Sequence, residues 1–198
     1  LDETGADVTD RYAIIEEFGT VRITPRKIKL SCPGRFKVYD GEPLKPWPVT
    51  LMAGELVAGH TLETEDGNAL VMPGTETAAP QYRILDAGGR DVTDQYEVSE
   101  NFGTLEILPI PLTLTTESLR KQYDGKPLSA DGWKHADGQL LEGHRLEMTV
   151  TAVLTQVGTV ENQGTARVID AAGKDVTGLY ALNYRFGTLE VTGIPLYI

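Results

Sequence analysis

The stretch of sequence that decides the fold lies at residues 91–108 and reads DVTDQYEVSENFGTLEIL. Its opening motif, Asp-Val-Thr-x-x-Tyr, also occurs at residues 7–12 and 175–180. Its Phe-Gly-Thr triplet also occurs at residues 18–20 and 186–188. Both motifs recur every 84 residues. A fixed period of this kind indicates a structural unit that is repeated along the chain.

Other motifs outside this stretch follow the same period. Tyr39-Asp40-Gly41 matches Tyr123-Asp124-Gly125, and a Pro-Leu pair follows each triplet after one further residue. A Gly-His pair ends at His60 and again at His144. Residues 25–108 align on residues 109–192 without a gap, with 30 identities in 84 positions. The repetition therefore extends over the whole of each 84-residue unit and is not confined to the short motifs.

The period divides the chain into four predicted segments. Residues 1–24 correspond to the C-terminal strands of a preceding repeat, residues 25–108 and 109–192 are two complete repeats, and residues 193–198 begin a following one. We place the boundaries at Pro25 and Pro109 because proline rigidifies linkers and begins new elements. We expect the parent protein to continue in both directions.

Short apolar runs bounded by turn residues predict β-strands. In the first repeat, Leu105 and Ile107 alternate with polar residues, which is the pattern of a half-buried strand. No window of a dozen residues has a helical period, and 21 glycines and 11 prolines interrupt the runs. Six or seven strands per repeat predict an all-β fold of tandem immunoglobulin-like β-sandwich modules. The strand candidates are residues 27–31, 49–52, 61–64, 82–85, 96–98 and 104–108.

The Asp-Val-Thr-x-x-Tyr motif supports a sandwich. Asp91 can accept an N–H at the start of a helical turn, and Asp94 follows three residues later. Tyr96 stands just before a strand, where a tyrosine hydroxyl in sandwich domains bonds to an upstream backbone group. Tyr12 and Tyr180 are equivalent, and we interpret all three as structural. The alternative is a β-grasp module with one short helix, for which only residues 54–68 leave room.

Taken together, Tyr-Asp-Gly-x-Pro-Leu, Gly-His, Asp-Val-Thr-x-x-Tyr and Phe-Gly-Thr-Leu-x-Ile resemble the YDG/MBG-type tandem repeats of bacterial cell-surface adhesins. The resemblance covers both complete repeats and the N-terminal segment. It implies a sandwich or β-grasp fold, an extracellular place at the bacterial cell surface, and a stalk or adhesive role without catalysis. Such repeats have no agreed set of ligand-binding residues, so the resemblance assigns none.

The composition limits the classes of partner that this chain is expected to bind. The net charge of −11 disfavours binding to nucleic acid or to anionic lipid headgroups. The sequence contains no transmembrane run, and we expect no membrane contact by this segment. The single cysteine, Cys32, excludes a disulfide framework within the chain, and Thr116 takes its place in the second repeat. We interpret Cys32 as a packed thiol. We expect a monomer whose partners are the neighbouring repeats of the same chain.

The residues that could carry chemistry have simpler structural interpretations. His60, His135 and His144 lie in no known nucleophile context, and we predict neither an enzyme nor a cofactor. Asp86, Asp91 and Asp94 share a Gly-rich loop whose oxygens could bind calcium. Turn and capping chemistry accounts for the same residues, and Gly178 replaces the third acid in the second repeat. We predict no metal site, with calcium kept as an alternative.

Trp47 and Trp133 could stack on sugar rings, but they are offset by two positions between repeats. Packing inside the module is the commoner role for such aromatic residues, and we favour it. The four asparagines have no asparagine counterparts in the neighbouring repeat, which argues against a built-in Lys–Asn isopeptide bond.

These observations predict a non-catalytic spacer that forms a semi-rigid stalk and projects an adhesive region from the cell. The alternative is an adhesin binding module that recognises a host glycan or matrix protein through loops or a strand edge. Residues 46–66 differ most in residue type from their counterparts, residues 130–150, and are the first place to look for such a site.

Overall fold

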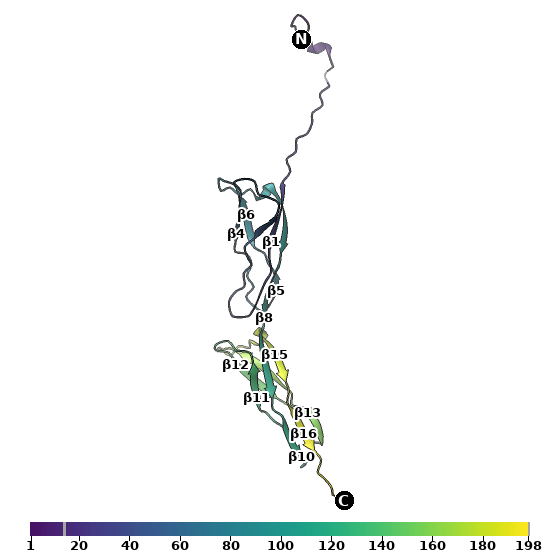
Figure 1. Cartoon of the computed structure of the whole chain (residues 1–198), viewed down its shortest axis with the longest axis vertical. Coiled ribbons are helices and arrows are strands. Elements are labelled where there is room, and N and C mark those ends of the chain that lie inside the picture. The colour runs from purple at the N-terminus through teal and green to yellow at the C-terminus, as the bar shows by residue number, and fades with distance from the viewer. Residues whose placement is uncertain (14, 198) are drawn as a thin grey trace.

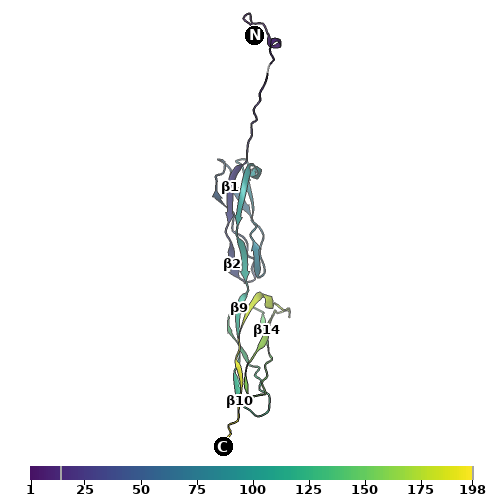
Figure 2. The same cartoon turned by 90° about the vertical axis from the view of Figure 1, so that its right-hand side faces the viewer.

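The computed structural model of the chain describes residues 1–13 and 15–197. Ile14 and Ile198, which fall in the predicted terminal segments 1–24 and 193–198, lie outside the described residues. Two groups of strands follow each other along one axis, with an extended N-terminal segment ahead of them (Figure 1, Figure 2). The fold is all-β. In the described part of the chain, the helical elements are three short 3₁₀ turns.

Eight strands lie between Pro25 and Pro109, and we call this group the first module. They form three sheets, with strand orders β3-β1-β7, β4-β6 and β2-β8-β5. Their bounds are β1 (Arg26–Cys32), β2 (Arg35–Val38), β3 (Thr50–Ala53), β4 (Thr61–Glu65), β5 (Gly74–Thr77), β6 (Gln81–Leu85), β7 (Tyr96–Phe102) and β8 (Thr104–Leu108).

The first and last strands of the module form a parallel pair along its whole length. β1 lies beside β7 and β2 lies beside β8, and the offset between partners is constant, from Arg26 with Tyr96 to Val38 with Leu108. The register does not change across the breaks at Pro33-Gly34 and at Gly103. The chain therefore enters the module at one end of this pair and leaves it at the other.

Two apolar clusters fill the first module. Ile28 and Leu30 of β1 pack with Ile84 of β6, so the sheets β3-β1-β7 and β4-β6 enclose one core in the manner of a sandwich. Leu105 and Ile107 of β8 pack with Leu44, Ala78 and Cys32 in the second cluster. Alternate residues of β8 are buried because the two faces of a strand differ in their access to water.

The second module follows Pro109 and repeats this arrangement. Its sheets have the orders β11-β9-β15, β12-β14 and β10-β16-β13, and its long parallel pair keeps the same offset, from Ile110 with Tyr180 to Gln122 with Thr192. Its strands are β9 (Ile110–Thr116), β10 (Leu119–Gln122), β11 (Trp133–Asp137), β12 (Arg145–Val150), β13 (Gly158–Glu161), β14 (Gly164–Ile169), β15 (Tyr180–Arg185) and β16 (Thr188–Thr192).

Most of the strand predictions are confirmed. The six predicted runs of the first repeat coincide with β1, β3, β4, β6, β7 and β8, although β7 is longer than expected. β2 and β5 were missed. Residues 54–68, where a β-grasp module would need its helix, contain β4 instead of a helix.

The N-terminal segment shows which parts of the repeat form without a complete module. The 3₁₀ turn η1 (Thr9–Arg11) is present, as are its equivalents η2 (Thr93–Gln95) and η3 (Thr177–Leu179). Val21 and Ile23, however, are 97% and 94% exposed, whereas their counterparts in β8 are buried. Local hydrogen bonds form the turn, but strand burial needs the rest of the module.

Candidate functional site

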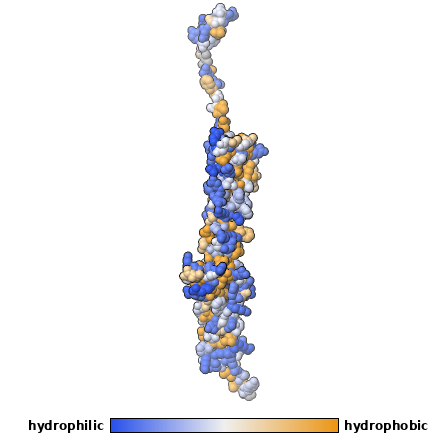
Figure 3. Space-filling view, turned by 90° about the vertical axis from the view of Figure 1, so that its left-hand side faces the viewer, coloured by the Kyte–Doolittle hydropathy of each residue, from blue (hydrophilic) through white to orange (hydrophobic). Residues whose placement is uncertain are grey.

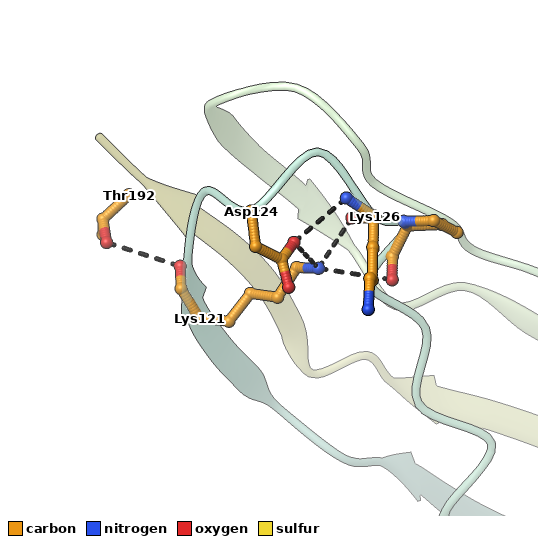
Figure 4. Close-up of polar contacts among 5 residues, drawn as sticks. Lys121, Asp124, Lys126 and Thr192 are labelled. Atoms are coloured by element: carbon orange, nitrogen blue, oxygen red, sulfur yellow. Dashed lines mark hydrogen bonds and ion pairs between the residues drawn. The ribbon is translucent and has the colours of Figure 1, made fainter. Parts of the chain in front are cut away.

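The repeated Tyr-Asp-Gly motif is a hydrogen-bonded turn at one end of each module. Asp124 accepts hydrogen bonds from Lys121 Nζ at 2.6 Å and from the backbone N–H of Lys126 at 3.0 Å (Figure 4). The same Lys121 ammonium donates to the carbonyl oxygen of Lys126 at 2.6 Å, and its hydrogen bond to Asp124 lowers the pKa of that carboxyl. Gly125 has a φ of 75°, which glycine adopts without strain.

The turn of the first module is built in the same way. Asp40 accepts hydrogen bonds from Lys37 Nζ and from the N–H of Glu42, and Gly41 has a φ of 89°. The leucine of the following Pro-Leu pair is buried, and its backbone pairs with a second leucine, Leu44 with Leu70. The motif therefore encodes a fixed turn that begins with a tyrosine and ends in the core.

The Asp-Val-Thr motif attaches the 3₁₀ turn to the neighbouring strand. Asp91 Oδ1 accepts hydrogen bonds from the backbone N–H and the hydroxyl of Thr93 at 2.9 and 2.7 Å. The Thr93 oxygen in turn accepts the N–H of Ile84 in β6 at 2.9 Å. Because this turn precedes β7 directly, these bonds fix the position at which Tyr96 begins the strand.

Tyr96 and His60 connect two motifs that are far apart in sequence. The Tyr96 hydroxyl accepts the backbone N–H of Val57 at 3.0 Å and is hydrogen-bonded to His60 Nδ1 at 2.8 Å. The second module repeats both contacts, from Tyr180 to the N–H of Leu141 at 3.1 Å and to His144 Nδ1 at 2.7 Å. In the first module the hydroxyl thus holds the loop between β3 and β4. Tyr12 is 70% exposed.

Removing the Tyr96 hydroxyl should destabilise the first module. In Tyr96→Phe the N–H of Val57 loses its acceptor in a part-buried hydrogen bond, which should lower the free energy of unfolding by about 1–3 kcal/mol. Urea denaturation followed by the fluorescence of Trp47, which lies in this module, measures the change. Tyr12→Phe is the matched control and should leave the transition in place. Equal behaviour of the two variants would contradict this role of Tyr96.

The glycine of the Phe-Gly-Thr motif lies where two backbones come into contact. A Cβ added at Gly103 would lie 2.6 Å from the Cα of Gly34, in the break between β1 and β2. A Cβ added at Gly187 would lie 2.7 Å from the carbonyl oxygen of Thr116. Glycine within a strand often marks such a close approach. At Gly19 an added Cβ would meet nothing within 4 Å.

One residue separates the two modules. β8 ends at Leu108 and β9 begins at Ile110, so Pro109 is the whole connection. Tyr39, which follows β2 directly, donates its N–H to the carbonyl oxygen of Leu108 at 2.8 Å. Its side chain packs against the cluster of the second module that contains Ile110 and Tyr180, as well as against the core of its own module. Burial raises the pKa of Tyr180, and the nearby Tyr39 adds to this shift.

Of the three acidic residues considered for calcium, Asp86 and Asp91 accept hydrogen bonds within the turns around them. Asp86 Oδ1 accepts the N–H groups of Gly88 and Arg90 at 2.8 and 3.0 Å, and its other oxygen pairs with the Arg90 guanidinium. Asp91 is bonded to Thr93, and Asp94 is exposed in the 3₁₀ turn. Within residues 1–13 and 15–197, no group of three or more His, Cys, Asp or Glu side chains is placed to hold a metal ion.

The buried residue at the end of the first strand differs in polarity between the two modules. Cys32 is fully buried in the first module, where burial raises the pKa of its thiol. Its counterpart Thr116 donates to the carbonyl oxygen of Asn162 at 2.7 Å. Asn162 is itself fully buried and donates through Nδ2 to the carbonyl oxygens of Glu117 and Ala130 at 2.9 and 3.0 Å. This buried network was not evident from the sequence, because its asparagine has no equivalent in the first repeat.

The two tryptophans lie in different settings. Trp47 is 48% exposed, and the Arg35 guanidinium stacks over its ring at 4.2 Å. Trp133 is half-buried beside an open cavity of about 540 Å³ that Glu117 and Lys134 also line. The residue offset seen in the sequence therefore corresponds to two distinct environments.

Comparison of the chain with known protein families and with curated proteins found no match. Among the described residues, no helix is long and apolar enough to span a lipid bilayer.

Proposed function

We propose that this chain is a non-catalytic spacer of a bacterial surface protein, in which modules joined end to end form a semi-rigid stalk that projects an adhesive region. The observation that carries the proposal is the parallel pair of first and last strands, which runs the length of each module with one register. The single-residue connection at Pro109 and the packing of Tyr39 across it support a stiff joint.

The parallel pair suits a protein that is pulled from its ends. Tension applied through the chain would act on the start of β1 at Arg26 and on the end of β8 at Leu108. Because the two strands are parallel, these forces slide one strand along the other and load all the ladder hydrogen bonds together. Bonds that must break together resist tension better than bonds that open one after another.

A single-molecule pulling experiment tests this function. Attachment points at Lys27 and Leu108 should load the first module in shear, whereas attachment at Lys27 and Glu97, which are direct neighbours in the ladder, should peel β1 from β7. We expect a several-fold higher unfolding force in the first geometry, since forced unfolding depends on the unfolding barrier along the direction of pull. Equal forces in both geometries would contradict the proposed role.

A binding module is the second candidate, and the cavity beside Trp133 favours it. Thr115, Thr116, Glu117 and Ser118 line this cavity with Trp133 and Lys134, a combination of hydroxyl, charged and aromatic groups that suits a sugar. A glycan array with the intact chain tests this, with Trp133→Ala as the variant that should lose any signal. The absence of retained glycan would leave the spacer as the function.

A further inference from the structure

The joint between the modules gives a template for interpreting the opposite end of the first module. At the joint, Tyr39 packs against the buried cluster of the second module that contains Ile110, Leu179 and Tyr180. Leu141 packs against the same cluster. The N–H of Tyr39 is bonded to Leu108, the last residue of β8. The joint therefore consists of a tyrosine side chain from one module and a receiving surface on the next.

The equivalent surface of the first module has a cavity of about 370 Å³. Its lining residues are the counterparts, one repeat earlier, of residues at or next to the joint. Val57 corresponds to Leu141, Gln95 to Leu179 and Tyr96 to Tyr180. The complete lining is Ile23, Thr24, Pro25, Arg26, Val57, Gln95 and Tyr96.

Exposure distinguishes the surface around this cavity from its counterpart at the joint. Val57 is 41% exposed, whereas its counterpart Leu141 is partly buried and packs against the cluster that Tyr39 also contacts. Figure 3 shows apolar residues gathered around the junction of the modules and again at the N-terminal end of the first module. In the first module, Arg26 and Gln95 stand at the positions of the buried Ile110 and Leu179. The rim of the cavity is therefore more polar than the surface at the joint.

We propose that this cavity is the socket for the tyrosine of a Tyr-Asp-Gly turn carried by a repeat on the N-terminal side of Pro25. The proposal rests on the proposed stalk function and specifies how its modules are joined. The occupant is a phenol side chain presented as Tyr39 is, and it packs against the socket as Tyr39 packs against the second module.

The N-terminal segment is placed to guide such a turn into the socket. Residues 20–24 have the sequence pattern of β8, and the exposed Val21 and Ile23 correspond to its buried Leu105 and Ile107. A strand equivalent to β2 that paired with this segment in the β2–β8 register would bring its tyrosine N–H to the carbonyl oxygen of Thr24. Thr24 lines the cavity.

An extended chain tests the socket. A copy of residues 25–84 placed directly before Leu1 combines with residues 1–24 to form one complete repeat. With the copy of Tyr39 seated, exchange of the Val57 amide hydrogen should slow by about tenfold or more, because local opening becomes rarer. Changing only the copy of Tyr39 to alanine is the matched control and should restore the original exchange rate. The Leu141 amide at the existing joint is the internal reference, and Tyr39→Ala should speed its exchange.

The outcomes separate this proposal from the stalk function. If the added repeat folds, as judged by its own protected amides, and Val57 exchanges as before, the socket is wrong. If the control variant protects Val57 as well as the tyrosine does, the socket is also wrong. Neither result bears on the pulling geometry of the first module, which tests the stalk. If the added repeat does not fold, the repeat unit assumed by both proposals is wrong.

Discussion

Replacing Gly103 by alanine should destabilise the first module by about 3 kcal/mol or more and leave the second module intact. The added methyl group would overlap the backbone of Gly34, which no side-chain rotation can relieve. Either the β2–β8 pair must separate where Gly103 meets Gly34, or the register of the long parallel pair must shift. Both responses break ladder hydrogen bonds.

The two tryptophans make this effect measurable module by module. Trp47 reports on the first module and Trp133 on the second, so urea denaturation of Gly103→Ala should move only the Trp47 transition. Gly19→Ala is the control, because it changes the glycine of the same motif where an added Cβ meets nothing within 4 Å. A Trp47 transition unchanged in Gly103→Ala would show that the middle of the module can open without loss of stability.

Changing Asn162 to aspartate should destabilise the second module by about 3–5 kcal/mol at neutral pH. The substitution keeps the size of the side chain but replaces the donating Nδ2 with an oxygen that faces the carbonyl oxygens of Glu117 and Ala130. The buried carboxylate would then have acceptors as neighbours. Its pKa in the folded protein should lie above the unfolded value of about 3.9, so the loss should grow as the pH rises above that value and shrink below it.

The effect is measured by denaturation followed through the fluorescence of Trp133 between about pH 3 and pH 8, a range that spans the titration of the new carboxyl. Trp47 reports on the first module, which serves as the reference. Asn183→Asp, at an exposed position of the same module, is the matched control and should cost little at any pH. A Trp133 transition in Asn162→Asp that stays in place across the whole range would mean that the asparagine donors are dispensable.

The sequence was informative where burial alternates along a strand. Leu105 and Ile107 predicted β8 because a half-buried strand leaves period-two apolar positions. β2 was missed because Phe36 and Val38 remain 75% and 45% exposed, and its pairing with β8 depends on residues at the far end of the repeat. β5, with the sequence Gly-Thr-Glu-Thr, has no apolar residue that could mark it.

The candidate site was predictable only in part. The period identified Tyr39, Tyr96 and His60 as positions that recur, but periodicity does not say what a residue contacts. That Tyr96 bonds to His60 and that Tyr39 crosses to the next module depends on the three-dimensional pairing of strands. Asn162 was considered only for a covalent cross-link, since a residue without a repeated counterpart gives no periodic signal.

The single proline between β8 and β9 has a geometric consequence for a longer array. A joint this short sets one angle of rotation between successive modules, so a side chain that recurs once in every repeat would trace a regular spiral around the long axis. The faces that carry the variable segments 46–66 and 130–150 would then be rotated relative to each other about the long axis from one module to the next. One extra residue at Pro109 would invert the pleat of the strand that follows and change the pitch of that spiral.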